Sequence, residues 1–176
     1  MQKKSNIVLI GLMGVGKTSI GRQLAKELNL SFYDSDQEIE KRTGATIPWI
    51  FDLEGEAGFR QRESKTITEL MTLNNIVLAT GGGVILNPEN RQTLATHGIV
   101  IYLQANLDTL VERTSRNQNR PLLANTNPQE ILEKLLAQRD PLYRETADLV
   151  YSTSANNINK IVQQIVQDLR QQGYFA

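Results

Sequence analysis

The chain has 176 residues, 40% of them hydrophobic, a length that suits one well-buried core better than two domains. Its 19 basic and 19 acidic residues balance, so the chain carries no overall charge that would attract nucleic acid or an anionic membrane surface. The absence of cysteine and the single histidine exclude disulfides, thiol nucleophiles, iron–sulfur clusters and cysteine-based zinc sites, so any bound metal ion must take oxygen ligands.

Five short apolar runs alternate along the chain with segments of helical period. The first run, within MQKKSNIVLIG, is too short for a signal peptide or a membrane span, which predicts a cytoplasmic protein. The five runs cover residues 7–10, 31–33, 76–79, 99–103 and 149–151. Such alternation is typical of βα units around a parallel sheet, so we expect one doubly wound α/β domain over residues 1–176.

Three segments between or after these runs have apolar residues at steps of three and four, as on the buried face of an amphipathic helix. The apolar positions are Ile20, Leu24 and Leu28 in the first segment, Ile131, Leu132, Leu135 and Leu136 in the second, and Ile158, Ile161, Val162, Ile165, Val166 and Leu169 in the third. We expect each of these faces to belong to the core.

Residues 11–21, GLMGVGKTSIG, lie directly between the first apolar run and the first helical segment. Gly11, Gly16, Lys17 and Thr18 match the pattern of a phosphate-binding loop, in which glycines let backbone N–H groups surround phosphate oxygens. The lysine ammonium contributes a positive charge next to the β and γ phosphates, and the threonine hydroxyl is an oxygen ligand for Mg²⁺. We therefore expect a site for ATP made by Gly14, Val15, Gly16, Lys17, Thr18 and Ser19.

The stretch FYDSDQEIE places Asp34 and Asp36 two residues apart at the end of the second apolar run. We place both at the end of the strand, so their side chains should leave the same face at the edge of the sheet that faces the phosphates. One carboxylate can then hold Mg²⁺ through its waters while the other accepts a proton from a substrate hydroxyl. The structural alternative is that Asp34 or Ser35 caps a helix, and capping and catalysis are compatible.

Three further stretches bear on the chemistry. GFRQRE places Arg60 and Glu63 three apart on an expected helix, where the alternative to a functional role is a weak surface ion pair. VLATGGGVI ends the third run with glycines at 81–83, which let a ligand touch bare backbone or simply make a tight turn. QRDPLYRETA carries Arg139 and follows the segment 113–129, which contains three arginines and no acidic residue.

Together these stretches resemble the shikimate kinase family, and the resemblance extends from the phosphate-binding loop to Asp148. The matching motifs are GLMGVGKTSIG, DSD at 34–36, FRxxE at 59–63, TGGG at 80–83, RPLL at 120–123 and RDPLY at 139–143. The resemblance implies phosphorylation of the 3-hydroxyl of shikimate by Mg²⁺ and ATP, in the biosynthesis of chorismate and the aromatic amino acids. It also implies a monomer with a P-loop kinase fold, similar to nucleoside monophosphate kinases, with five parallel strands.

Carried onto matching positions, the resemblance implies a site for shikimate and one for the nucleotide. The shikimate contacts would be Asp36, Arg60, Gly82, Gly83 and Arg139. The phosphate and metal contacts would be Lys17, Thr18 and Arg120, with Asp34 acting on metal-bound water, and the catalytic residues would be Asp36, Lys17 and Arg120. The chemistry agrees, because guanidinium groups bind the carboxylate of a small polyol while a carboxylate accepts from its hydroxyls.

The resemblance also implies two moving parts. A lid over about residues 113–127 would bring Arg120 onto ATP and stack Arg113 on the adenine. A shikimate-binding subdomain would cover about residues 34–63. The loop STSANN before the last helix lacks the arginine that some relatives place near the adenine, and Asn156 is expected to contact the nucleotide there.

Three alternatives stay open from the sequence. A kinase of gluconate or of a nucleoside monophosphate would share the loop and the lid, although TGGG and RDPLY argue against both. A non-catalytic nucleotide-binding switch would leave Asp36 without a task, and the chain has no NKxD stretch to read guanine. RNA binding by the arginine segment is disfavoured by the balanced charge and by the lack of interleaved aromatic residues. We therefore expect shikimate and ATP as partners, and neither nucleic acid nor membrane.

Overall fold

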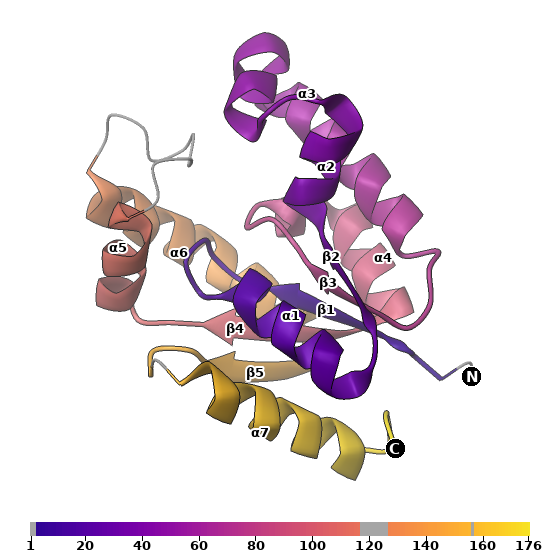
Figure 1. Ribbon diagram of the computed structural model, residues 1–176. Helices are drawn as coiled ribbons and strands as arrows, with labels where there is room; N and C mark the ends of the chain where they lie inside the picture. Colours follow the sequence, from indigo (N-terminus) through magenta and orange to yellow (C-terminus); the bar gives the residue numbers. More distant parts are fainter. Residues whose placement is uncertain (1–2, 117–126, 156) are drawn as a thin grey trace.

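The computed structural model describes residues 3–116, 127–155 and 157–176 (Figure 1). Its strands are β1 (Asn6–Ile10), β2 (Ser31–Asp34), β3 (Ile76–Ala79), β4 (Gly98–Gln104) and β5 (Leu149–Ser152). They form one parallel sheet in the order β2-β3-β1-β4-β5. Each predicted apolar run coincides with a strand to within one residue at either end, and the expected five-stranded α/β fold is confirmed.

Helices cover both faces of this sheet. They are α1 (Lys17–Leu28), α2 (Ser35–Thr43), α3 (Ile47–Leu70), the short 3₁₀ helix η1 (Val84–Leu86), α4 (Pro88–His97), α5 (Leu107–Ser115), α6 (Pro128–Thr146) and α7 (Ile158–Gln171). Figure 1 shows α1 and α7 side by side on the near face, with α4 and α6 on the other. In the described part of the chain, no helix has the length and apolar character needed to cross a membrane.

The main core lies between the sheet and these helices. The residues of β1 and β3 are all buried, as expected of central parallel strands that are covered on both faces. The predicted helix faces contribute to this core with Ile20 and Leu24 from α1, Leu132 from α6, and Val162, Ile165 and Leu169 from α7. The expectation is wrong for Ile158, which is exposed at the start of α7. Hydrophobic burial of this kind is the dominant favourable term in folding, and here it makes the sheet a rigid base for its carboxyl edge.

A second and smaller apolar cluster lies outside the main core, between α2 and the first half of α3. Its buried members are Ile39, Ile50 and Phe59. Helix α3 changes direction at Gly55, whose φ of 70° is a left-handed conformation that residues with a side chain rarely adopt. Figure 1 shows α2 and this part of α3 projecting beyond the carboxyl edge of the sheet. The projecting part falls within the segment 34–63 that the sequence analysis interprets as a subdomain.

Candidate active site

A cavity of about 570 Å³ opens at the carboxyl edge of the sheet, below the projecting part of α2 and α3. Because all strands are parallel, the loops after β1, β2 and β3 meet at this edge. Those loops carry the phosphate-binding pattern (residues 11–18, the P-loop), the DSD stretch and the glycines of the TGGG turn (residues 80–83). Helices α3 and α6 complete the lining with Arg60, Glu63 and Arg139.

The P-loop has the backbone conformation that its glycines predict. Gly14 and Gly16 have φ of 88° and 99°, and Gly16 is the residue immediately before α1. The Lys17 ammonium lies inside the loop and donates to the carbonyl oxygens of Gly11 and Leu12, at 2.5 and 2.9 Å. A helix N-terminus and a lysine therefore face the same part of the cavity, which is the arrangement that attracts phosphate groups.

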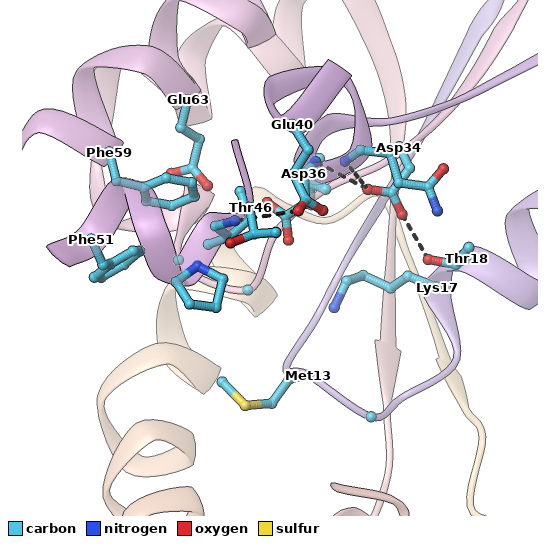
Figure 2. Close-up of a pocket in the computed structure, with 18 of the residues that line it drawn as sticks. Met13, Lys17, Thr18, Asp34, Asp36, Glu40, Thr46, Phe51, Phe59 and Glu63 are labelled. Atoms are coloured by element: carbon cyan, nitrogen blue, oxygen red, sulfur yellow. Dashed lines mark hydrogen bonds between the residues drawn. The ribbon is translucent and has the colours of Figure 1, made fainter. Parts of the chain in front are cut away.

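Asp34 is the last residue of β2 and also the N-cap of α2. Its Oδ1 accepts from the backbone N–H groups of Asp36 and Gln37, at 3.0 and 3.1 Å, so the capping alternative is confirmed. Its Oδ2 accepts from the Thr18 hydroxyl at 2.7 Å (Figure 2). The expectation that Asp34 and Asp36 share one strand face is wrong, because Asp36 lies in the first turn of α2. The turn from strand to helix still leaves both residues lining the cavity.

The neighbouring oxygens of Thr18 and Asp34 fit Mg²⁺, which prefers oxygen ligands and usually retains several waters and substrate phosphates in its shell. Among the described residues, no cluster of three or more histidine, cysteine or acidic side chains is arranged to enclose a metal ion. The donor set is therefore sparse, as expected where one or two protein oxygens hold Mg²⁺ together with a nucleotide.

Arg60 and Glu63 form an ion pair on the wall of the cavity. Arg60 Nη1 donates to Glu63 Oε1 at 2.9 Å, and the Glu63 side chain is only 1% exposed. The surface alternative is therefore wrong for this pair. Burial, with a smaller contribution from the Asp36 carboxylate, raises the pKa of Glu63 to about 7 against the opposing effect of Arg60.

The TGGG turn fits between these charged groups because it has no side chains after Thr80. A Cβ on Gly81 would lie 2.8 Å from an Asp36 carboxylate oxygen, and a Cβ on Gly83 would collide with the Arg60 guanidinium. On Gly82 it would lie 3.3 Å from Nη1 of Arg139. The three glycines therefore allow two guanidinium groups and two carboxylates to surround one stretch of bare backbone, which is more than a tight turn requires.

Arg139 extends from α6 into the same cavity and is 3% exposed. Within the described residues, no hydrogen-bond partner reaches the buried Nε atoms of Arg60 and Arg139. Buried donors without a protein partner are rare and mark places where a ligand or water supplies the acceptor. The two guanidinium groups thus point to an anionic ligand between α3, the TGGG turn and α6.

The nucleotide-contact predictions outside the P-loop have different outcomes. Arg113 lies on α5, and its guanidinium donates to the carbonyl oxygens of Gly14 and Thr153, at 3.1 and 2.6 Å. It therefore joins the P-loop to the loop after β5. Arg120 and Asn156 lie outside the described residues, as does most of the predicted lid.

Comparison with known proteins agrees with the geometry. The family model described as shikimate kinase matches residues 13–170. The shikimate kinase of Pseudomonas aeruginosa (strain LESB58) is 53% identical over 165 residues, which cover 94% of this chain and 96% of that protein. The chain belongs to the shikimate kinase family. A shikimate kinase of Nitrosococcus oceani (strain ATCC 19707) is 55% identical over 166 residues, covering 94% of this chain and 87% of that protein.

Solved structures separate the family from its fold relatives. The structure of a shikimate kinase from Acinetobacter baumannii in complex with shikimate has a TM-score of 0.94 and 47% identity, covering 98% of this chain and 96% of that one. A gluconokinase from Sinorhizobium meliloti 1021 has a TM-score of 0.57 at 16% identity, a likeness that shows a shared fold alone. The resemblance inferred from the motifs is thus confirmed, and the chain is a kinase with ATP as co-substrate.

Several lining residues of this shikimate kinase family member were not predicted from its sequence. The additional lining side chains are Met13, Gln37, Glu40, Thr46, Ile47, Pro48, Phe51 and Phe59. Figure 2 shows Phe51 and Phe59 side by side at one end of the cavity, with Met13 extending from the P-loop. Met13 is inside the P-loop pattern, and the others lie near the DSD and FRxxE stretches. Proximity to a motif was their only signal, because none of them belongs to a pattern that specifies a chemical role.

Proposed function

We propose that this cavity carries out the family reaction by binding shikimate between α3, the TGGG turn and α6, with ATP on the P-loop. The observation that carries the proposal is the convergence of Asp36, Arg60 and Arg139 on one cavity that also contains the P-loop lysine. The products are shikimate 3-phosphate and ADP. Alternatives that use only the P-loop leave the convergence of Arg60 and Arg139 on the cavity unexplained.

Asp36 is the proposed proton acceptor. In the reaction, the 3-hydroxyl oxygen bonds to the γ-phosphorus while the bond to the leaving ADP oxygen breaks, and the hydroxyl proton passes to the carboxylate. Asp36 lies in the first turn of α2 and lines the cavity beside the P-loop and Gly81. Lys17, inside the P-loop, stabilises the charge of the transferring group.

Arg60 and Arg139 are the proposed ligands of the shikimate carboxylate. Both are held by the protein, Arg60 by Glu63 and Arg139 by burial on α6, so little side-chain freedom is lost when a carboxylate binds. Gly82 and Gly83 let the shikimate ring approach the backbone closely.

Thr18 and Asp34 are the residues that would hold Mg²⁺, the threonine directly and the aspartate through water. When bound, the ion supplies positive charge to the phosphate oxygens. We further propose that Arg120, from a lid over about residues 113–127, adds charge to the transferring group, and that Arg113 and Asn156 contact the nucleotide. We also propose that the enzyme acts as a monomer in the cytoplasm, without nucleic acid or membrane as a partner.

The test is ADP release from ATP and Mg²⁺ with shikimate, with gluconate and AMP as control acceptors. We expect release that depends on shikimate and on Mg²⁺, with 3-phosphorylated product identified by mass and NMR. Equal release without shikimate would indicate a nucleotide-hydrolysing switch. Release driven by gluconate or AMP would indicate another small-metabolite kinase.

A further inference from the structure

Tyr143 is fully buried on α6, one helical turn after Arg139. Its ring stacks on that of Tyr102, with the ring centroids 4.9 Å apart and the planes inclined by 27°. This stack fills the space between α6 and β4, and it fixes where the Tyr143 hydroxyl lies. A buried tyrosine hydroxyl requires a hydrogen-bond partner, so the partner identifies the group that the tyrosine keeps in position.

The Tyr143 hydroxyl holds one group of the proposed shikimate site next to another. It donates to the carbonyl oxygen of Gly82 at 2.5 Å. The Arg139 guanidinium lies beside the same glycine, since a Cβ on Gly82 would lie 3.3 Å from its Nη1. Burial raises the pKa of Tyr143 well above its usual range, so the hydroxyl keeps its proton and remains a donor to the TGGG turn.

This bond matters for the TGGG turn because Gly82 offers no side chain through which the protein can orient it. On the other side of the turn, the Gly81 N–H donates to the buried hydroxyl of Ser35 at 3.1 Å. The peptide groups of the turn are therefore held between α2 and α6 by two buried hydroxyls. Loss of the bond from Tyr143 leaves the Gly82 peptide free to rotate and its carbonyl without that donor.

Tyr102 provides an internal comparison. It belongs to the same ring stack and is equally buried, but its hydroxyl donates to Oδ1 of Asp140 at 2.7 Å. Asp140 also accepts from the exposed Arg144, so this hydroxyl is directed toward the surface ion pair of α6 and not toward the cavity. The two tyrosines therefore separate stabilisation of α6 from orientation of the TGGG turn.

We infer that Tyr143 is a positioning residue for shikimate binding, because its hydroxyl holds the Gly82 peptide in place beside the Arg139 guanidinium. A carboxylate held by a guanidinium and lying against bare backbone requires both to be placed within a fraction of an ångström. The inference rests on the proposed function, which assigns both groups to shikimate.

The test compares Tyr143→Phe with Tyr102→Phe, since each removes one buried hydroxyl from the same ring stack. For Tyr143→Phe we expect the KM and Kd for shikimate to rise about tenfold, with the KM for ATP changed by less than about twofold. For Tyr102→Phe we expect the shikimate KM to change by less than about twofold. The fall in Tm should be similar for the two variants, because each loses one hydrogen-bonded hydroxyl. As a second measurement, Tyr143→Phe added to Arg139→Lys should raise the shikimate KM much less than tenfold.

Equal increases in shikimate KM for both tyrosine variants would overturn the inference, because they would show general loosening of α6. Full additivity with Arg139→Lys, or an unchanged KM in Tyr143→Phe while the wild type phosphorylates shikimate, would also overturn it. A wild type that does not respond to shikimate would overturn the proposed function instead, so the two failures are distinguishable.

Discussion

At the scale of single residues, the charged groups of the cavity are divided between binding and chemistry. Lys17 belongs to the P-loop, whereas Asp36, Arg60 and Arg139 surround the TGGG turn. Sequence motifs identified these four residues because each is part of a chemically specific pattern. The burial of Glu63 was not predictable from the sequence. The FRxxE spacing fits an exposed surface ion pair as well as the observed pair, in which the Glu63 side chain is 1% exposed.

Asp36→Asn preserves shape but removes the proton acceptor. We therefore expect kcat to fall about 10²- to 10⁴-fold, with small changes in the KM for ATP. Steady-state ADP release measures both quantities, and Asp52→Asn, on the exposed surface of α3, is the control for loss of one negative charge. Normal turnover in the Asp36 variant would assign proton transfer to another group.

Arg139→Lys keeps the charge and loses the planar pair of donors. We expect shikimate binding to weaken by about 1.5–3 kcal/mol, because an ammonium cannot reproduce a two-pronged contact to a carboxylate. Arg144→Lys is the matched control, since Arg144 lies on the same helix and pairs with Asp140 at the surface. Calorimetric titration gives both dissociation constants, and an unchanged value for the Arg139 variant would place this residue outside the acceptor site.

Glu63 gives the stability of the protein a pH dependence with a definite sign. Its pKa rises from 4.5 to about 7 on folding, chiefly because it is buried, so between these values the folded state retains a proton that the unfolded chain releases. The contribution of Glu63 to the free energy of unfolding should therefore fall by up to about 3 kcal/mol as pH rises through this window, and stay constant above it.

Glu63→Gln tests this prediction because glutamine does not titrate. Denaturant unfolding from pH 4 to pH 8 should show that the stability of the variant relative to the wild type increases across the window. A constant difference between the two proteins would mean that the pKa of Glu63 does not change on folding, with Arg60 compensating fully for its burial.

At the scale of secondary structure, the strands were predictable and two helix features were not. Continuous apolar runs define strands that are covered on both faces, and glycines mark where β1 and β3 end. The boundary at Asp34 was ambiguous, because an aspartate is equally suited to the end of a strand and to a helix cap. The bend in α3 was hidden, since a glycine inside an otherwise helical stretch reveals neither its φ nor whether the helix continues.

Gly55→Ala tests the importance of this bend. A Cβ at this position would meet no atom within 4 Å, so the substitution adds backbone strain without steric overlap. We expect the free energy of unfolding, measured in denaturant, to fall by at least about 1 kcal/mol. The reason is that an alanine at φ 70° is strained, whereas a glycine is not. Unchanged or increased stability would show that α3 straightens at little cost.

At the scale of the whole molecule, the protein combines a rigid sheet with a small projecting unit that has its own core. Ile39, Ile50 and Phe59 pack with one another and not with the main core, and Gly55 interrupts the helix within this unit. Units with few buried contacts are those that move on binding. The sequence motifs showed which residues belong to the site, whereas this division depends on packing that no local pattern encodes.

The only tryptophan of the chain, Trp49, reports on this unit. It lies in the first turn of α3 and is 59% exposed, so it is not packed in the core. Its neighbours Pro48 and Phe51 line the cavity. If the unit closes when Asp36 and Arg60 engage shikimate, the surroundings of the indole must change, and its emission should shift or be quenched.

Fluorescence titration measures this directly, with shikimate, ATP and gluconate added separately. We expect a saturable change with shikimate at the concentration range of its KM, a smaller one with ATP because Lys17 lies on the rigid part, and none with gluconate. The Arg139→Lys variant is the control for occupancy, and its fluorescence midpoint should shift in step with its calorimetric Kd. If Trp49 emission stays constant at saturating shikimate in active enzyme, the projecting unit does not move on binding, and the acceptor site is fully formed before the substrate arrives.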